Sequence, residues 1–391
     1  MVPITSMRIV SLTYARNEED ILEAFVRHHV GAIDLMFFIL HRSTDDSKRI
    51  LEQLQQEGMP VIFEESDDLG YMQNEAVTRL MHRVARDEQA DWIVPLDSDE
   101  FLVGIGAEPR SVFASFPDDM LSIPWRTYVP MASDPDDRNM LKRITHRPAS
   151  NPQETQKMCI PKKIATNEGM RIAMGNHCVI EGKSKVSSIP CPRLALAHFP
   201  VRTPSQVMHK VLLGWLSNNA NPRRHPEDSF HWGTLFSEFI ESGPPSSERL
   251  TELARCYGTT HTLNATIPLV RDPIPTEFVL RYTPSDERNP WLAFGENAIT
   301  VARSLGELIV EHECAIAIHD KLQKDFEAAY LELEARRHST ECTLHDTANA
   351  LRQKQAEMMA MRTTHSWRWT EALRQAESKI MPALLKKRMK A

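Results

Sequence analysis

The sequence predicts an α/β protein, with a Rossmann-like parallel or mixed sheet covered by helices on both faces and a long helical region after it. Between residues 7 and 105, short and almost wholly apolar runs alternate with segments of helical periodicity. The connections between them are short, as in parallel sheets whose strands are buried on both faces. From about residue 290 to Pro382, helix-forming residues dominate and Gly and Pro are rare. These patterns together give the fold class.

The first part of the chain reads as strands alternating with helices. Residues 7–13 form the first expected strand, and Asn17 is expected to cap the helix that follows, which has apolar residues at helical spacing. Gly31 and Gly58 are expected to end the first and second helices. The remaining expected strands are residues 35–40, 61–63 and 92–96, and the remaining expected helices follow Ser47 and Tyr71.

The fourth strand ends in a cluster of acidic residues. The apolar run 92–96 is followed by Asp97, Ser98, Asp99 and Glu100. Such a cluster is costly without a cation, and Mg²⁺ or Mn²⁺ prefers carboxylate oxygens together with the phosphates of a substrate. Because ligands of open α/β sheets bind at the carboxyl ends of the strands, we expect these side chains to face a metal-bound diphosphate. The alternative is an acidic turn that caps the next helix.

Right-handed crossovers would bring the loops after strands one, two and four to one edge of the sheet. The first two of these loops contain Asn17, Glu18 and Asp45. Each residue also has a structural explanation, since Asn17 and Asp45 can cap helices and a helix dipole favours Glu18. A second Asp-x-Asp copy at 134–136 has no strand before it, so it is expected to lie in a solvated loop.

Residues 104–205 are irregular and rich in Pro. His198 follows the last expected strand of this segment, where it could reach the metal. The alternative is a histidine whose ring is hydrogen-bonded to a backbone carbonyl. A helix that opens at Thr203 or Ser205 is expected to run through Trp215. The expected strands are residues 121–130, 162–165, 170–173, 179–180 and 193–197, with a loop at 134–139.

The C-terminal region carries an incomplete heptad repeat, in which apolar residues such as Leu322 and Leu333 are interrupted by His312 and Arg336. It predicts either a coiled coil used for self-association into a homo-oligomer or a helix that packs back on the first domain. The basic segment 384–390 either contacts anionic lipid at a membrane surface or is a frayed terminus.

Size and charge limit the classes of function. The 391 residues suffice for two or three structural units, and the net charge of −7 argues against non-specific nucleic-acid binding. Six scattered cysteines without a Cys-x-x-Cys pair suit a reducing compartment. No apolar run approaches the roughly 18 residues of a membrane span, and the first residues do not read as a signal peptide. We therefore expect a cytoplasmic protein, with peripheral membrane contact left open.

Three segments of the first part carry a family resemblance, and they are Thr13–Glu18, Arg42–Ser47 and Leu96–Phe101. Together they resemble glycosyltransferase family 2 enzymes with a GT-A fold, in particular a bacterial branch of the family, which has Thr in place of Ser47. This resemblance covers about residues 7 to 105.

Later segments extend the resemblance. Gly175–His177 and His198–Arg202 are similar to recurrent segments of the same bacterial branch, which takes the similarity to about residue 215. Ser366–Arg374 is similar to a tail on bacterial surface-polysaccharide transferases.

The resemblance implies an inverting hexosyl transfer from a nucleotide diphosphate sugar, by default a UDP-sugar, to a carbohydrate or lipid-linked hydroxyl, with Mn²⁺ or Mg²⁺ as cofactor. By this resemblance Thr13, Asn17 and Glu18 would line the nucleotide, Asp45 would lie near the base or ribose, and Asp97 and Asp99 would hold sugar and metal. We add Tyr14 and Ser98 to the donor-binding residues and His198 to the metal ligands, and expect Glu100 to orient either Asp99 or the acceptor. The implied units are a donor half at 1–105, an acceptor half at 106–235, an irregular or helical linker at 236–290 and a helical region at 291–391.

We expect a single displacement in which the metal neutralises the departing diphosphate while a carboxylate or imidazole removes the acceptor's proton. The family pattern does not identify this base, and Asp134, Asp136 and His177 are the candidates. Arg202 and Lys210 could instead carry diphosphate charge, although solvated helix faces also explain them.

Two other functions fit less well. A nucleotidyltransferase would need a Gly-rich basic phosphate loop after the first strand, and Tyr14–Asp20 contains no Gly. A noncatalytic nucleotide-sugar-binding or scaffold protein on a degenerate fold would not need Glu18, Asp97 and Asp99.

Overall fold

A computed structural model of the chain describes residues 7–68, 71–150, 155–219, 230–257, 267–285 and 289–363. The chain divides into two compact units, Met1–Leu308 and Ile309–Ala391. The expected boundaries at 105, 235 and 290 all fall inside the first unit, because one sheet runs through both of its expected halves.

Within the described residues, the main sheet of the first unit has nine strands, which run in mixed directions. Its order is β3-β2-β1-β4-β8-β6-β13-β5, with β12 beside β6. β1, β2, β3 and β4 are parallel, whereas β8 and β5 run antiparallel to their neighbours. The strands are β1 (Ile9–Ala15), β2 (Leu35–His41), β3 (Val61–Ser66), β4 (Trp92–Pro95), β5 (Glu100–Gly104), β6 (Leu121–Thr127), β8 (Gln156–Pro161), β12 (Ile189–Pro190) and β13 (Leu194–His198).

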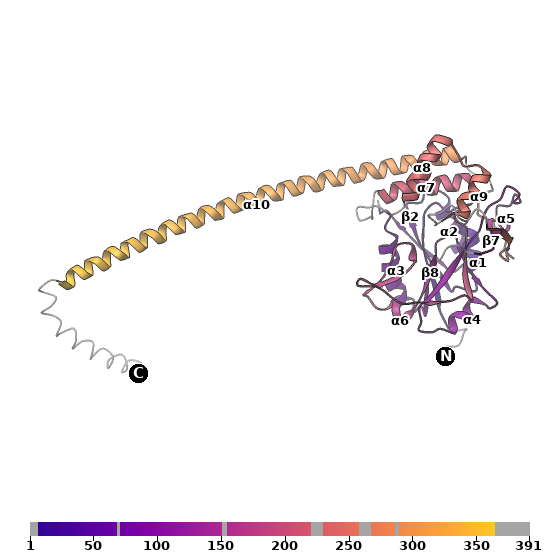
Figure 1. Ribbon diagram of the computed structural model, residues 1–391, viewed down its shortest axis with the longest axis horizontal. Coiled ribbons are helices and arrows are strands. Elements are labelled where there is room, and N and C mark those ends of the chain that lie inside the picture. The colour runs from indigo at the N-terminus through magenta and orange to yellow at the C-terminus, as the bar shows by residue number, and fades with distance from the viewer. Residues whose placement is uncertain are drawn as a thin grey trace. The chain divides into compact units, whose positions relative to one another are not determined.

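Helices cover both faces of this sheet, as the sequence predicts (Figure 1). Neighbouring residues of a strand point to opposite faces, so Ile9 joins one buried apolar cluster and Val10 the other. The helices in the first cluster are α1 (Leu22–His29), α2 (Ser47–Gln56) and α4 (Pro109–Ala114), and those in the second are α3 (Gln73–Asp87) and α6 (Lys162–Ala165).

The parallel half of the sheet agrees with the sequence prediction, and the differences lie after it. Residues 162–165 form helix α6 instead of the expected strand, and β8 and β5 were not expected at all. The helix after β1 begins at Leu22 with Ile21 at its N-cap, so the expected cap at Asn17 is wrong. Asn17 instead has a left-handed backbone (φ 55°), a conformation that Asn tolerates better than most residues.

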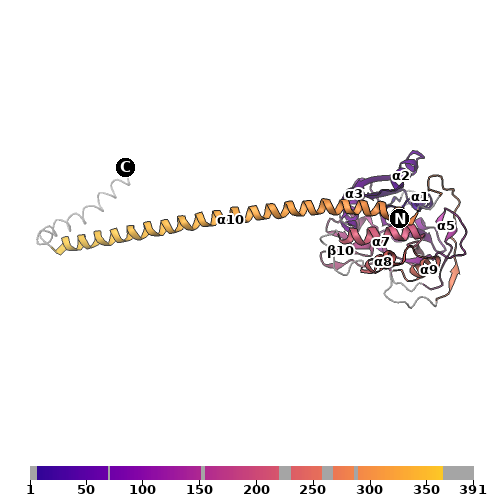
Figure 2. The ribbon, with the colours of Figure 1, turned by 90° about the horizontal axis from the view of Figure 1, so that it is seen from above.

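Three helices follow the sheet. They are α7 (Pro204–Asn219), α8 (Phe230–Ser242) and α9 (Ser247–Arg255), and α7 lies beside α8 (Figure 2). Gly214 of α7 makes this approach close, because a Cβ there would lie 2.0 Å from the ring of Trp232. The smaller elements are α5 (Met140–Arg143), β7 (His146–Pro148), β9 (Met170–Ile172), the 3₁₀ turn η1 (Met174–Asn176), β10 (Val179–Glu181), β11 (Ser184–Lys185) and β14 (Leu269–Arg271).

The predicted C-terminal helix is present as α10 (Pro290–Thr363). Its apolar side chains in the second unit are exposed, among them Ile316, Phe326 and Leu333. Self-association through them stays a prediction. The segments 366–374 and 384–390 lie outside the described residues. Among the helices that the structure describes, none combines the length and apolarity that crossing a membrane requires.

Within the first unit, a buried carboxylate on α1 binds a segment that is distant in the sequence. Glu23 is fully buried and accepts backbone N–H bonds from Arg281, Tyr282 and Thr283, each at 2.8 Å. It also accepts a 2.8 Å bond from Arg27 Nε. Burial alone would raise the pKa of Glu23, but these donors outweigh it and lower the pKa. Glu23 therefore holds residues 281–283 on α1 as a charged acceptor.

Replacing Glu23 with Ala is expected to lower the free energy of unfolding by about 3–5 kcal/mol, because buried donors lose their acceptor. The contribution of Glu23 should be fully present above the ordinary carboxyl pKa, and it should be lost as pH falls through the lowered pKa of the folded state. Urea denaturation at neutral and acidic pH measures both effects. Glu52→Ala, at an exposed position of α2, should change stability by less than about 0.5 kcal/mol, and equal losses in the two variants would contradict the assignment.

Candidate active site

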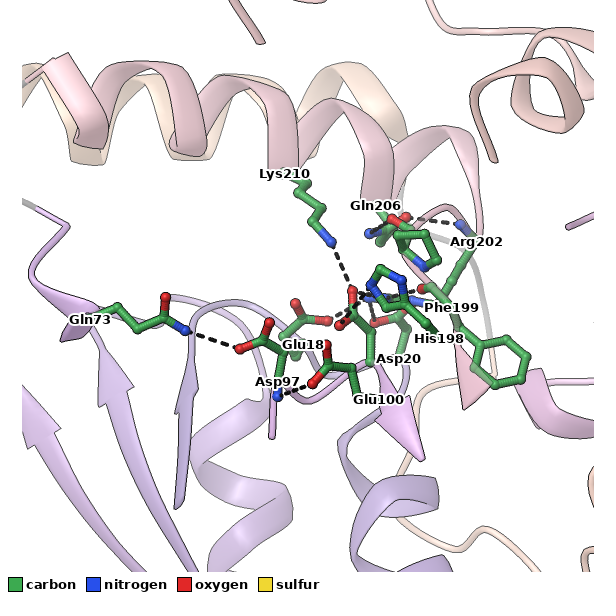
Figure 3. A network of polar contacts seen from close by, with 12 residues as sticks. Glu18, Asp20, Gln73, Asp97, Glu100, His198, Phe199, Arg202, Gln206 and Lys210 are labelled. Carbon is green, nitrogen blue, oxygen red and sulfur yellow. Dashed lines mark hydrogen bonds and ion pairs between the residues drawn. The ribbon is translucent and has the colours of Figure 1, made fainter. Parts of the chain in front are cut away.

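A cavity of about 410 Å³ opens at the carboxyl ends of β1 and β4, where the strand order places a topological switch point. It lies between these strand ends and helix α7, and Figure 3 shows the network of polar contacts around it. The lining includes ten of the residues selected from sequence, which are Tyr14, Asn17, Glu18, Asp97, Ser98, Asp99, His177, His198, Arg202 and Lys210.

Asp97 follows β4 and is held by donors on both carboxylate oxygens. Gln73 Nε2 donates to Oδ1 at 3.0 Å (Figure 3), and Lys157 Nζ lies 2.6 Å from Oδ2. Lys157 is fully buried on β8 and lies 3.1 Å from Glu100 Oε1 as well. Burial lowers the pKa of Lys157, but Asp97 and Glu100 outweigh burial and raise the pKa to about 12. Lys157 is therefore a permanent cation against Asp97.

Glu100 supports the same turn. Its Oε2 accepts a 2.9 Å bond from Asp97 N, and its own N–H donates to Asp97 O at 3.0 Å. Glu100 thus contacts the backbone of Asp97, whereas the sequence prediction had it orient either Asp99 or the acceptor.

Asp99 is 3% exposed and lies among three basic side chains. Lys210 Nζ is 2.8 Å from Oδ2, Arg202 Nη1 is 3.8 Å from Oδ2, and His198 Nε2 is 3.7 Å from Oδ1. Burial would raise the pKa of Asp99, but the charges of Lys210 and Arg202 outweigh it and hold the pKa well below its usual range. Asp99 is therefore ionised wherever the protein is folded near neutral pH.

His198 lies at the end of β13, pairs in register with Glu100 of β5 and is 2% exposed. Its Nδ1 is buried and has no hydrogen-bond partner among the residues that the structure describes. The 3.7 Å from Nε2 to Asp99 is too long for a hydrogen bond. Burial lowers the pKa of His198 to about 3, with Asp99 opposing and Lys210 reinforcing the shift. The ring is therefore neutral, and the alternative that a backbone carbonyl satisfies it finds no support in the contacts of this residue.

Arg202 joins the helical layer to the first loop. Its fully buried guanidinium donates to both oxygens of Asp20, at 2.6 and 2.9 Å, and to Glu18 Oε2 and Phe199 O. Burial lowers the pKa of Arg202, but Asp20 and Glu18 outweigh burial and raise it. Glu18 and Asp20 are thus held by Arg202 at the edge of the cavity.

The loop after β1 is braced by the loop after β2. Ser43 Oγ accepts from Asn17 N at 3.2 Å, Ser47 Oγ from Glu18 N at 3.0 Å and Asp45 Oδ2 from Glu19 N at 3.0 Å. These three N–H groups already donate to side-chain oxygens, so they do not form an anion-binding nest for phosphate.

His177 follows η1 at the cavity wall. Its Nδ1 lies 2.9 Å from Gln156 O, and since a carbonyl only accepts, Nδ1 carries the proton and Nε2 is the free acceptor of the neutral ring. Burial and nearby Lys157 lower the pKa of His177. Gly175 (φ 74°) is required here, because a Cβ at this position would lie 2.7 Å from the His177 ring.

The remaining residues selected from sequence do not line this cavity. Thr13 is buried in β1, and Asp45 and Asp136 line a neighbouring cavity. Asp134 Oδ2 accepts a 2.8 Å bond from Met131 N and so closes its own turn. Of the three candidate bases, the structure brings only His177 to the carboxylates.

The donor set fits a divalent cation in part. A carboxylate and a neutral imidazole that face each other, Asp99 and His198, are suitable ligands for Mg²⁺ or Mn²⁺. Asp97 fits less well, because Lys157 and Gln73 already occupy its oxygens. No group of three His, Cys, Asp or Glu residues arranged to hold a metal occurs in the described part of the chain. A cation here would therefore need oxygen ligands from its substrate.

Among the site residues that sequence reasoning missed are the two that hold Asp97. Lys157 stands in a strand that was not expected, and Gln73 is the first residue of α3. A basic residue inside an apolar run, as in Lys157–Pro161, is the signal that could have identified the first.

No protein-family model matches the chain, and no curated protein matches it. Solved structures show remote similarity. A mannosyltransferase from Pyrobaculum calidifontis, in complex with GDP-mannose and Mn²⁺, is 14% identical, with a match over 32% of this chain and 37% of that one and a TM-score of 0.25. Glucosyl-3-phosphoglycerate synthase from Mycobacterium tuberculosis, in complex with Mn²⁺, UDP and glucosyl-3-phosphoglycerate, is 21% identical over 31% of this chain and 45% of that one, with a TM-score of 0.22.

The chain thus spans less than half the length of these solved proteins. Sequence identities and TM-scores this low assign no activity to the chain.

Proposed function

We propose that this chain transfers a hexosyl group from a nucleotide diphosphate sugar to a hydroxyl of a carbohydrate or lipid-linked acceptor, with inversion. The observation that carries the proposal is the pairing of ionised Asp99 with neutral His198, facing a cavity at the switch point between β1 and β4. Buried carboxylates at the carboxyl ends of parallel strands are suited to bind a metal-bound diphosphate. A surface polysaccharide is the proposed product.

The donor side follows from the contacts of the cavity. Asp99 and His198 would hold Mn²⁺ or Mg²⁺. When bound, this cation would neutralise the negative charge of the leaving diphosphate. Asp97, fixed by Gln73 and Lys157, would accept hydroxyl hydrogen bonds from the donor's ribose or sugar. Tyr14 lines the cavity and packs edge-on against Tyr71, so these rings offer an aromatic wall for the nucleotide base, with uracil as the default.

The proposed base is His177. Its free Nε2 is unprotonated near neutral pH, because its pKa is lowered, and it lies in the wall that also contains Asp97. An imidazole in this state can take the proton of an attacking hydroxyl. Asp134 and Asp136 lie outside this wall and are not proposed for the role.

The structure weakens the alternatives. The N–H groups of the loop after β1 are bonded to side chains, which disfavours the phosphate cradle that a nucleotidyltransferase would need. A noncatalytic protein on the same fold would bind a nucleotide sugar without consuming it, so the following experiment separates it from an enzyme.

We expect Mn²⁺ together with a nucleotide sugar to raise the melting temperature and to be followed by slow release of nucleoside diphosphate. UDP-glucose and GDP-mannose are the first donors to test, with UMP and GMP as controls that lack the second phosphate. At ligand concentrations 100-fold above Kd the stabilisation should be about 2.7 kcal/mol. Stabilisation without turnover would favour a binding protein, and no stabilisation by any nucleotide sugar would contradict the proposal.

A further inference from the structure

The oxygens of Asp99 that would bind a divalent cation already have a resident cation. Lys210 Nζ lies 2.8 Å from Asp99 Oδ2 and 5.3 Å from the centre of the Tyr257 ring. Figure 3 shows Lys210 reaching down from its helix toward the carboxylate cluster. At this distance the ammonium of Lys210 and the carboxylate of Asp99 form an ion pair. A second cation on the same carboxylate would meet its repulsion at short range.

Lys210 differs in its freedom to move from Lys157 and Arg202, the other two cations that contact the buried carboxylates of the site. Lys157 and Arg202 have side chains that are 1% and 0% exposed, and each contacts two or more carboxylates. The side chain of Lys210 is 24% exposed, lines the cavity and ends a flexible four-carbon stem. Lys210 is therefore the cation that a ligand in the cavity can draw away.

The charges of the cluster limit what Lys210 can do alone. Among the described residues that form it, five carboxylates face three cations. Burial raises the pKa of Glu18 to about 7 and that of Glu100 to about 8, so the excess is at most two negative charges and is smaller near neutral pH. The carboxylates are Glu18, Asp20, Asp97, Asp99 and Glu100. A nucleoside diphosphate adds further negative charge, so Lys210 by itself leaves the loaded cavity strongly anionic, and a divalent cation is needed in addition.

We infer that Lys210 exchanges partners. It neutralises Asp99 in the empty cavity and moves to the diphosphate when a nucleotide binds, which frees Asp99 to hold the divalent cation beside His198. Cation and nucleoside diphosphate therefore bind cooperatively, and the cation binds weakly without the nucleotide. This inference rests on the proposed function for the identity of the anion.

The test is a Mn²⁺ titration of the full chain, with free Mn²⁺ measured by electron paramagnetic resonance, in the absence and presence of UDP or GDP. In the wild type, the nucleoside diphosphate should tighten Mn²⁺ binding at least fivefold. In Lys210→Met, Mn²⁺ alone should bind at least fivefold more tightly than in the wild type, and the tightening by nucleotide should shrink. Lys48→Met, at an exposed lysine paired with Glu65, is the matched control and should behave as wild type.

Lys210→Arg keeps the charge and should retain weak Mn²⁺ binding, which guards against a Met variant that folds poorly. Folded Lys210→Met with unchanged or weaker Mn²⁺ binding would overturn the exchange while leaving the transferase proposal intact, provided that nucleotide still binds. Nucleotide binding that is indifferent to Mn²⁺ in every variant would also overturn it. If no nucleoside diphosphate binds the wild type, the proposed function is overturned, and the exchange with it.

Discussion

Asp99→Asn is expected to reduce the release of nucleoside diphosphate from the cognate sugar donor by about 10²- to 10³-fold, the loss that removal of one charge-stabilising group typically causes. Asn preserves the shape of the side chain but removes the negative charge that would hold a cation beside neutral His198. Lys210 and Arg202 would then lie near each other without their shared carboxylate. Initial rates at saturating Mn²⁺ measure the loss, and far-ultraviolet circular dichroism checks the fold.

The chain provides its own matched variant for this test. Asp136 belongs to the second Asp-x-Asp copy, is exposed and lies outside the cavity that contains Asp99. Asp136→Asn should keep wild-type turnover, because it changes the same motif without touching the proposed metal ligands. Equal activity of Asp99→Asn and wild type would remove Asp99 from the reaction, and loss of activity in Asp136→Asn would restore that residue as a candidate base.

The sequence predicted the parallel half of the fold because its strands are buried on both faces. β1, β2 and β4 are almost wholly apolar, and the polar residues that follow them mark where each strand ends. Since the crossovers between parallel strands have one hand, those ends had to meet at one edge. Glu18, Asp97 and Asp99 therefore came together as expected.

The antiparallel half was harder because its strands depend on distant partners. β8 pairs with β4 and β6, and no local pattern in Gln156–Pro161 specifies either neighbour. Lys157 was consequently not selected as a site residue, although it lies fully buried and contacts both Asp97 and Glu100. Charge pairing between residues 60 positions apart cannot be deduced from local periodicity.

Asn17 shows a different reason for failure. Asn just before an apolar helical pattern is a standard N-cap signal. In the structure, Asn17 Oδ1 instead accepts a 2.8 Å bond from Thr44 N of the loop after β2. Both arrangements satisfy the same side-chain acceptor, and the choice depends on how closely two loops approach in the folded sheet.

Arg202→Met is expected to lower the free energy of unfolding by about 3–5 kcal/mol, the usual cost of leaving buried charges without their partner. Met fills a similar volume but provides none of the donors that hold Asp20, Glu18 and Phe199 O. Arg202→Lys should recover only part of the loss, because one ammonium cannot reproduce the two-point bond to Asp20. Urea denaturation of the three proteins measures the series.

Arg83→Met is the appropriate control, since Arg83 is a partly exposed arginine paired with Glu64 on the surface. Its loss should cost less than about 1 kcal/mol, as is typical of exposed ion pairs. Because Arg202 connects the segment after β13 to the loop after β1, its removal should also loosen the cavity wall and weaken nucleotide binding in whatever fraction remains folded. Wild-type stability of Arg202→Met would show that Glu18 and Asp20 do not need this guanidinium, and that the electrostatic account of the cavity is wrong.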